Sequence, residues 1–494
     1  MSNIRVGYAG SIAFFIGIIR LILGFVFITI VTRILSPEEY GTWTLIGGLL
    51  VYVLILHYIE TYWLTRETAR NNDSGKTAIF SGGIFSSIGI VAYLLIATVV
   101  SLNSQVDMDV LLFAVILVPA NFFYSILSAI NYGWKPQSQS YGLIIIDIVK
   151  IPAVLLFVYS LDFGVIGVIL SAFLGMLSSI VLHLVYGYKR LIGTFNYKFL
   201  KKWFKLSWLT LYPPLAGLIF SLDVTIFTII IGTSEGLGYY GAAVAIGSLV
   251  TYGGLTFSAI YPKLLGSNNV DFLQNSITRL LYFIIPLSVI IILFSKPGLY
   301  VLNPIYVVIF PAAIILSLKF FTFTIFDSCN FILRGIEKVD VQESSSFKDY
   351  IKSKLFYVPT LQMIQHSIYA SSLTIFLLLN HNLPIEDLIF YWAIISLVTQ
   401  LPFTIYISIL VRKNISFKLE WKKISKYLCS SLIFVLIWHF SNDFLNYNSS
   451  LIDFLPWLLF FIGICVLSYV ILTFIIDSSA RQFINSIINE IKKS

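Results

Sequence analysis

The segment from Ile34 to Leu50, ILSPEEYGTWTLIGGLL, decides the fold, because it ends one strongly apolar run and begins the next. Its second half recurs 200 positions later, where the segment from Tyr240 to Leu249 repeats five of ten residues without a gap. Membrane segments that occur twice in one chain are typical of transporters built from two similar halves. The repeat therefore predicts two halves, each starting with two spans joined by a short turn.

The composition is that of a membrane protein. Of the 494 residues, 58% are hydrophobic and only 11% are charged, and the mean hydropathy is +0.90. Soluble domains carry about 25% charged residues. Cys329, Cys429 and Cys465 have neither the spacing of a metal site nor that of a redox pair. We therefore predict an all-α integral membrane protein without a metal site.

Fourteen apolar runs are long enough to cross the hydrocarbon core, which takes about 20 residues of helix. The predicted spans are residues 10–33, 40–63, 79–102, 109–133, 141–160, 163–187, 207–231, 238–261, 277–296, 305–333, 355–380, 387–411, 427–447 and 454–476.

The basic residues support this count, because Lys and Arg are retained on the cytoplasmic side of a membrane. With the N-terminus inside, 27 of the 32 basic residues fall on predicted inner segments. The outer connections hold Arg33 and Lys296, and Arg20, Lys150 and Lys319 lie inside spans. We therefore predict a multi-pass protein of the cell membrane with both termini cytoplasmic. The two copies of the turn then share the outer face, so the repeat is parallel.

Several function classes lack support in the sequence. No P-loop, HExxH or GxSxG motif occurs, and the outer connections are too short to form a catalytic domain. The net charge of +8 comes from the inner loops, where basic residues attract anionic lipid, so nucleic acid is not needed to explain it. An enzyme is therefore disfavoured, and a membrane glycosyl or acyl transferase is the weakest alternative.

The turn RILSPEEYG, from Arg33 to Gly41, follows a first span that contains Gly17, Arg20 and Gly24. This start resembles the polysaccharide-repeat-unit flippases of the multidrug, oligosaccharidyl-lipid and polysaccharide (MOP) exporter superfamily, and the fourteen spans fit the same resemblance. It implies two lobes of six helices around a central cavity that opens alternately to each side, with spans 13 and 14 as additions.

The resemblance and the span count together predict the domain organisation. The N-lobe covers residues 1–187 and the C-lobe residues 207–411, and residues 412–494 contain spans 13 and 14 and a cytoplasmic tail. Between the lobes, residues 188–206 alternate Lys with Phe, Trp and Leu, which predicts an amphipathic helix on the inner surface. A basic tether that carries no function beyond topology is the alternative for this linker.

The resemblance also implies a function, which is the transfer of a polyprenyl-(di)phosphate-linked oligosaccharide from the cytoplasmic to the outer leaflet for cell-surface polysaccharide assembly. The implied partners are the lipid-linked oligosaccharide, membrane lipids, and a polysaccharide polymerase or glycosyltransferases. We expect a monomer without a cofactor, in which sodium ions or protons are candidates for coupling. A cation-coupled extruder of small amphipathic compounds is the alternative function.

Basic residues inside the spans are candidates to bind the substrate diphosphate. A charge inside the membrane is costly unless it pairs with an opposite charge or faces a hydrated cavity. Arg20 lies near the middle of the first span, and Lys319 in the middle of the tenth. Ion pairing between helices is the alternative for Arg20, and pairing with Asp327 for Lys319. Lys150 follows Asp147 by three residues, which favours a structural ion pair on one helical face.

Acidic residues inside the spans are candidates for coupling-ion binding or for pairing between the lobes. Asp223 stands out, because the seventh span that contains it has no basic residue. It is a candidate to bind sodium or a proton, or to pair with Arg20. Asp147 and Asp327 are weaker candidates for the same roles.

Glu60 and His57 share a face near the inner end of the second span. At that depth we expect water to reach both side chains. They are a candidate inner gate, and a solvated helix end without transport function is the alternative.

Overall fold

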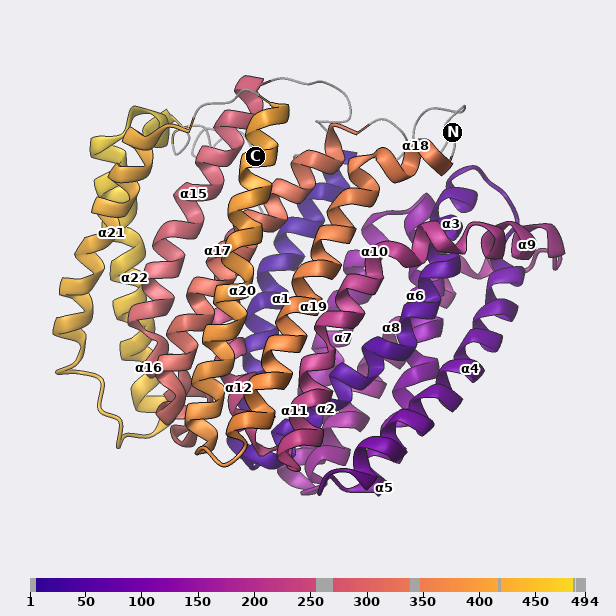
Figure 1. Ribbon diagram of the computed structural model, residues 1–494, viewed down its shortest axis with the longest axis horizontal. Coiled ribbons are helices and arrows are strands. Elements are labelled where there is room, and N and C mark those ends of the chain that lie inside the picture. The colour runs from indigo at the N-terminus through magenta and orange to yellow at the C-terminus, as the bar shows by residue number, and fades with distance from the viewer. Residues whose placement is uncertain (1–5, 255–269, 338–346, 416–418, 483–484, 486–494) are drawn as a thin grey trace. The chain divides into compact units, whose positions relative to one another are not determined.

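The computed structural model is helical throughout the part of the chain that it describes, which is residues 6–254, 270–337, 347–415, 419–482 and 485 (Figure 1). No strand occurs in these ranges. The chain forms two compact units. The first unit consists of residues 1–241 and 362–383, and the second of residues 242–361 and 384–494.

Long helices make up both units. The helices of the first unit are α1 (Val6–Ile34), α2 (Pro37–Leu54), α3 (Tyr58–Ala69), α4 (Gly75–Leu102), α5 (Met108–Phe113), α6 (Leu117–Trp134), α7 (Gln137–Val154), α8 (Gly164–Leu191), α9 (Tyr197–Lys205), α10 (Ser207–Phe220) and α11 (Leu222–Ile231). Those of the second are α15 (Val270–Leu293), α16 (Ser295–Leu302), α17 (Phe310–Gly335), α18 (Phe347–Lys352), α20 (Ile385–Asn414), α21 (Trp421–Ser441) and α22 (Leu451–Ile476). Both units share α12 (Glu235–Gly247) and α19 (Lys354–Asn380).

Eleven helical segments among the described residues are long and apolar enough to cross a membrane, so the prediction of an all-α, multi-pass membrane protein is confirmed. Some of these segments join two helices. One example is the segment Pro37–Ala69, in which a 3-10 turn at residues 55–57 links α2 to α3. The large apolar side chains on the outer faces fit a lipid environment, since Leu95 of α4 and Leu467 of α22 are both exposed.

The three remaining predicted spans also coincide with helices. The first is α1, which has 29 residues, and the eighth begins with α12 and continues as a 3-10 helix to Gly254. The rest of the eighth, residues 255–261, lies outside the described residues. The eleventh is α19, which is 27 residues long but carries Gln362, Gln365 and His366 in its first half. The number of fourteen spans stays a prediction.

The turn quoted above is explained by local chemistry. Ser36 caps α2, because its hydroxyl accepts from the main-chain N–H of Glu39 and the Glu39 carboxylate accepts from the N–H of Ser36. Pro37 occupies the first helical turn, where its missing N–H costs no hydrogen bond. The sequence SPEE therefore starts a new helix directly after α1 ends at Ile34.

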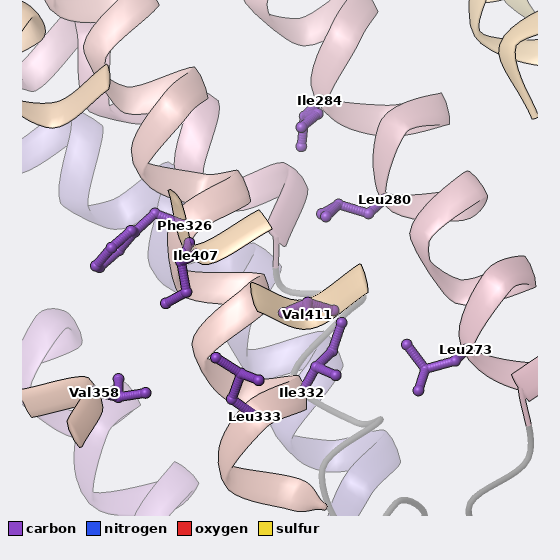
Figure 2. Packing of buried hydrophobic residues seen from close by; sticks show 9 residues of the cluster. All are labelled: Leu273, Leu280, Ile284, Phe326, Ile332, Leu333, Val358, Ile407 and Val411. Atoms are coloured by element: carbon purple, nitrogen blue, oxygen red, sulfur yellow. The ribbon is translucent and has the colours of Figure 1, made fainter. Parts of the chain in front are cut away.

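The core of the second unit lies where α15, α17, α19 and α20 pack together (Figure 2). α17 and α20 run side by side (Figure 1). The buried cluster consists of Leu273, Leu280, Ile284, Phe326, Ile332, Leu333, Val358, Ile407 and Val411. Branched and aromatic side chains interlock in this way in close-packed interiors.

The linker between the predicted lobes contains a short helix, α9. Asn196 caps its start by accepting from the N–H of Lys198. Trp203 is buried, whereas Phe204 is exposed. Lys202 forms an ion pair with Glu67 of α3, with Nζ 2.6 Å from Oε1. The helix is therefore docked on the first unit rather than extended as a tether.

Candidate functional site

Three charged side chains form a network between two membrane helices of the first unit. The Nε atom of Arg20 on α1 donates to Oδ2 of Asp147 on α7 at 2.8 Å. Nζ of Lys150, one turn further along α7, donates to Oδ1 of the same carboxylate at 3.1 Å. The predicted pair of Lys150 and Asp147 is thus present, and Arg20 joins it from a distant part of the sequence.

Local features of three helices shape this network. α7 contains Pro152, which cannot donate the usual helical hydrogen bond, and the helix continues as a π-helical turn over residues 155–160. Gly175 of α8 lies against the carbonyl of Ile146, so a side chain there would crowd α7 beside Asp147. The ring of Phe27 on α1 lies 4.2 Å from Nζ of Lys150 and provides a cation–π contact.

The network keeps an excess of positive charge, since two cations share one carboxylate. The Asp147 side chain is only 6% exposed, whereas that of Arg20 is 37% exposed. Among the residues whose side chains the structure describes, the two terminal nitrogens of Arg20 have no hydrogen-bond partner. A guanidinium with two such nitrogens can bind a phosphate in a bidentate manner. The site therefore presents a partly open guanidinium that a buried carboxylate holds in place.

A second polar site in the first unit surrounds Asp223, which is buried. Its Oδ2 atom accepts from the hydroxyl of Tyr369 on α19 at 2.7 Å, and its Oδ1 atom accepts from the main-chain N–H of Val224. The ring of Phe220 stacks on that of Tyr369, with centroids 5.6 Å apart. Asp223 therefore has a protein donor on each oxygen.

The Asp223 site lies where the seventh span is broken. α10 ends at Phe220 and α11 begins at Leu222, and α10 contains Pro213 and Pro214. The hydroxyl of Tyr52 on α2 donates to the carbonyl of Ser221 at this break, at 2.7 Å. Broken membrane helices with exposed main-chain groups are typical of ion and substrate sites in transporters.

Arg20 and Asp223 do not pair with each other in the structure, because Arg20 is bound to Asp147 and Asp223 to Tyr369. Lys319 is buried on α17 of the second unit, with Nζ 4.2 Å from the ring centroid of Phe320. The described residues show no direct ion pair between Lys319 and Asp327.

The expectation that water reaches Glu60 is wrong. Glu60 is fully buried, and one of its oxygens accepts from the hydroxyl of Ser81 on α4. Its other oxygen, Oε1, has no partner among the described residues and lies next to Gly82. Gly82 leaves room for Ile126 of α6 and for this carboxyl group, which is thereby closed off from solvent. His57 is half-buried, with Nδ1 3.4 Å from the hydroxyl of Thr61.

Sequence reasoning missed Tyr369 as the partner of Asp223. It also did not identify Asp147 as the partner of Arg20. Tyr369 lies in the polar stretch of α19 that also contains Gln365 and His366, and Nδ1 of His366 lies 2.6 Å from the carbonyl of Ala216. The polar residues within this predicted span were the feature of the sequence that could have pointed to Tyr369. Pairing with α10 and α11 could not be read from the sequence because those helices lie about 150 positions away.

Comparison with solved structures identifies the fold of the chain. No protein-family model and no curated protein matches the chain. The solved structure of the lipid II flippase MurJ in an inward closed conformation matches 94% of this chain and 98% of its own, with a TM-score of 0.64. An inward-facing multidrug resistance MATE transporter of the MOP superfamily matches 80% of this chain and 94% of its own, with a TM-score of 0.57. The sequence identities are 15% and 14%.

The chain has the MOP fold. Within this MOP fold, the two candidate sites lie on helices that correspond in the sequence repeat, because Arg20 is 200 residues before Phe220 and Asp223 follows three residues later. The two matched structures are those of a flippase and a transporter.

Proposed function

We propose that this chain is a flippase that moves a polyprenyl-phosphate-linked or diphosphate-linked oligosaccharide from the cytoplasmic to the outer leaflet. The observation that carries the proposal is Arg20, whose terminal nitrogens have no partner among the described side chains while Asp147 holds its Nε. The likeness to MurJ, itself a lipid II flippase, supports a lipid-linked substrate.

The physical argument concerns the headgroup. A sugar diphosphate cannot cross hydrocarbon without a hydrated path and a compensating charge. Arg20 and Lys150 together exceed the charge of Asp147, so the network attracts an anion while the fold keeps both cations in place. Asp147 would orient Arg20 and leave its bidentate face to the phosphate.

The proposed mechanism also requires two lobes and alternating access to the two leaflets. The proposed architecture includes fourteen spans, divided into an N-lobe of residues 1–187 and a C-lobe of residues 207–411, and cytoplasmic termini. Arg20, Lys150 and Lys319 are the proposed phosphate-binding residues. The enzymes that build or polymerise the glycan would supply and consume the substrate.

The test is transport in vesicles. The purified chain is reconstituted with a fluorescent lipid-linked oligosaccharide that carries a diphosphate, and an external quencher reports how fast the fluorophore changes leaflet. We expect Arg20→Gln to slow this rate about tenfold or more, because a bidentate charged contact is lost. Arg20→Lys should retain part of the rate, since it keeps the charge but not the fork geometry.

Arg190→Gln is the matched control, because Arg190 is an arginine of the first unit whose side chain donates to Asn71 in an exposed position. It should transport at the wild-type rate. Wild-type transport by a folded Arg20→Gln protein, and by the double variant Arg20→Ala, Lys319→Ala, would contradict the proposed site.

A cation-coupled extruder of small amphipathic compounds is the second candidate, and Asp223 favours it. This buried carboxylate at a helix break, bonded to Tyr369, has the chemistry of a proton or sodium site. Substrate-induced proton or sodium flux into vesicles without any lipid-linked oligosaccharide, abolished by Asp223→Asn, would support this function over the first.

A further inference from the structure

Two adjoining cavities lie in the second unit, whereas both candidate sites belong to the first. The first has a volume of about 290 Å³ and an apolar lining that includes Phe283, Leu287 and Val466. The second has a volume of about 270 Å³ and is lined largely by polar groups, among them Arg279 and Lys423. Tyr282 of α15 lines both cavities, so an apolar compartment and a basic one meet at this residue.

Hydrogen bonds and ring packing hold Tyr282, the residue that lines both cavities, in place. The hydroxyl groups of Tyr282 and Thr473 on α22 lie 3.2 Å apart, and the hydroxyl of Tyr469 donates to the Tyr282 carbonyl at 2.8 Å. The ring of Tyr427 on α21 meets that of Tyr282 edge to face, with centroids 5.2 Å apart. The cavities are therefore preformed by α15, α21 and α22, which pack together (Figure 1).

Among the described residues, the lining of the polar cavity includes two basic side chains, Arg279 and Lys423, and no acidic one. Lys423 is paired with Glu420, with Nζ 2.7 Å from Oε2, and Lys426 lies 3.8 Å from Asp477. Arg279 adds a further cation on α15, where its side chain is exposed. An anion that enters this cavity would meet Arg279 and Lys423 on facing helices.

The positions of the cavities along the helices match the layers of a membrane. The basic cavity lies at the start of α21 and just after the end of α22, which the distribution of Lys and Arg assigns to the cytoplasmic side. The apolar cavity lies deeper, beside Pro286 and Ile290 of α15. Basic pockets between membrane helices on the cytoplasmic side are typical binding sites for anionic lipid headgroups.

We propose that the joined cavities bind an anionic glycerophospholipid of the inner leaflet. Its phosphate lies at Arg279 and Lys423, and part of one acyl chain fills the apolar cavity past Tyr282. Val466 is 48% exposed, which leaves the apolar cavity open for a chain to enter from the side. The bound lipid joins α21 and α22 to α15. The inference does not depend on which substrate the chain transports.

Native mass spectrometry of the full-length chain tests the headgroup, with dioleoyl phosphatidylglycerol and dioleoyl phosphatidylcholine as probes. We expect the wild type to retain phosphatidylglycerol in preference to phosphatidylcholine. Arg279→Gln, Lys423→Gln should weaken phosphatidylglycerol binding about 30-fold, because each basic group near the surface contributes about 1 kcal/mol. Arg412→Gln, Lys413→Gln removes two exposed cations at the end of α20 and should leave binding unchanged.

Equal loss in both double variants would show that only the general surface charge attracts the lipid, and would overturn the site. Unchanged binding in Arg279→Gln, Lys423→Gln would overturn it as well. Preferential binding of a polyprenyl phosphate over phosphatidylglycerol would replace the proposed occupant with a different lipid.

A second pair of variants tests the apolar cavity. Val466→Trp fills it, whereas Leu467→Trp adds the same ring at a neighbouring, more exposed position that does not line it. We expect Val466→Trp to weaken phosphatidylglycerol binding about tenfold and Leu467→Trp to have no effect. Equal affinity in the two variants, measured on protein that elutes as the wild type does, would exclude an acyl chain from this cavity.

Discussion

Gly41 of α2 packs against the main-chain carbonyl of Ser234, the residue that precedes α12. The contact is reciprocated on α12, where Gly238 packs against the carbonyl of Pro37. The hydroxyls of Thr42 and Ser234 also lie 2.9 Å apart. The segment that opens the second span is thus in direct contact with the start of its own repeat, and glycine permits this close approach of two helix ends.

Substitution of this glycine should destabilise the protein. A methyl group at position 41 would overlap the Ser234 carbonyl, so we expect Gly41→Ala to lower the free energy of unfolding by about 1–3 kcal/mol. Gly47→Ala on the same helix has open space around it and should be neutral or stabilising by up to about 1 kcal/mol. Thermal unfolding of the purified variants measures both. Equal melting temperatures for the two variants would contradict the contact.

A double-mutant cycle should detect the ion pair between Arg20 and Asp147. We expect a coupling energy of about 1–2 kcal/mol from unfolding of Arg20→Gln, Asp147→Asn and the double variant, because the carboxylate is buried. In the pair of Lys423 and Glu420 the carboxylate is more exposed than that of Asp147, so this pair should couple by less than about 1 kcal/mol. A coupling near zero for Arg20 and Asp147 would mean that solvent replaces the contact.

Substitutions at Asp223 and Tyr369 distinguish the effect of the carboxylate charge from that of the tyrosine hydrogen bond. Asp223→Asn removes the charge and leaves one oxygen for the two donors, Tyr369 and Val224, so we expect it to stop ion-driven transport and to destabilise by about 1 kcal/mol. Tyr369→Phe removes the donor and should destabilise by about 1–2 kcal/mol. Tyr159→Phe is the control, since Tyr159 is highly exposed. Transport rates in vesicles under an imposed ion gradient, with melting temperatures alongside, distinguish a coupling role from a structural one.

The docking of α9 depends on Trp203. Because this indole is buried, Trp203→Ala should cost about 3–5 kcal/mol locally and release the helix from α3 and α4. Limited trypsin digestion should then cut faster at Lys201 and Lys202. Tyr197→Ala, which changes an exposed ring of the same helix, should be cut at the wild-type rate. Unchanged cleavage in Trp203→Ala would mean that the ion pair of Lys202 and Glu67 holds α9 by itself.

The candidate site was predictable only in part. Lys150 and Asp147 are three residues apart on one helix, so helical periodicity alone predicted their pair, and the structure contains it. The burial of Glu60 was not predictable, because it depends on Gly82 of a neighbouring helix rather than on position along its own span.

The sequence by itself determined that the chain is an all-α membrane protein with helices at the expected places, because apolar length and the distribution of basic residues are local properties. It also determined the helix start at Ser36, where capping involves only neighbouring residues. The tertiary structure decided the partners of the buried charges. Arg20 meets Asp147 across 127 residues, and Asp223 meets Tyr369 across 146. Such pairs depend on which helices pack together, and that packing is a property of the whole fold.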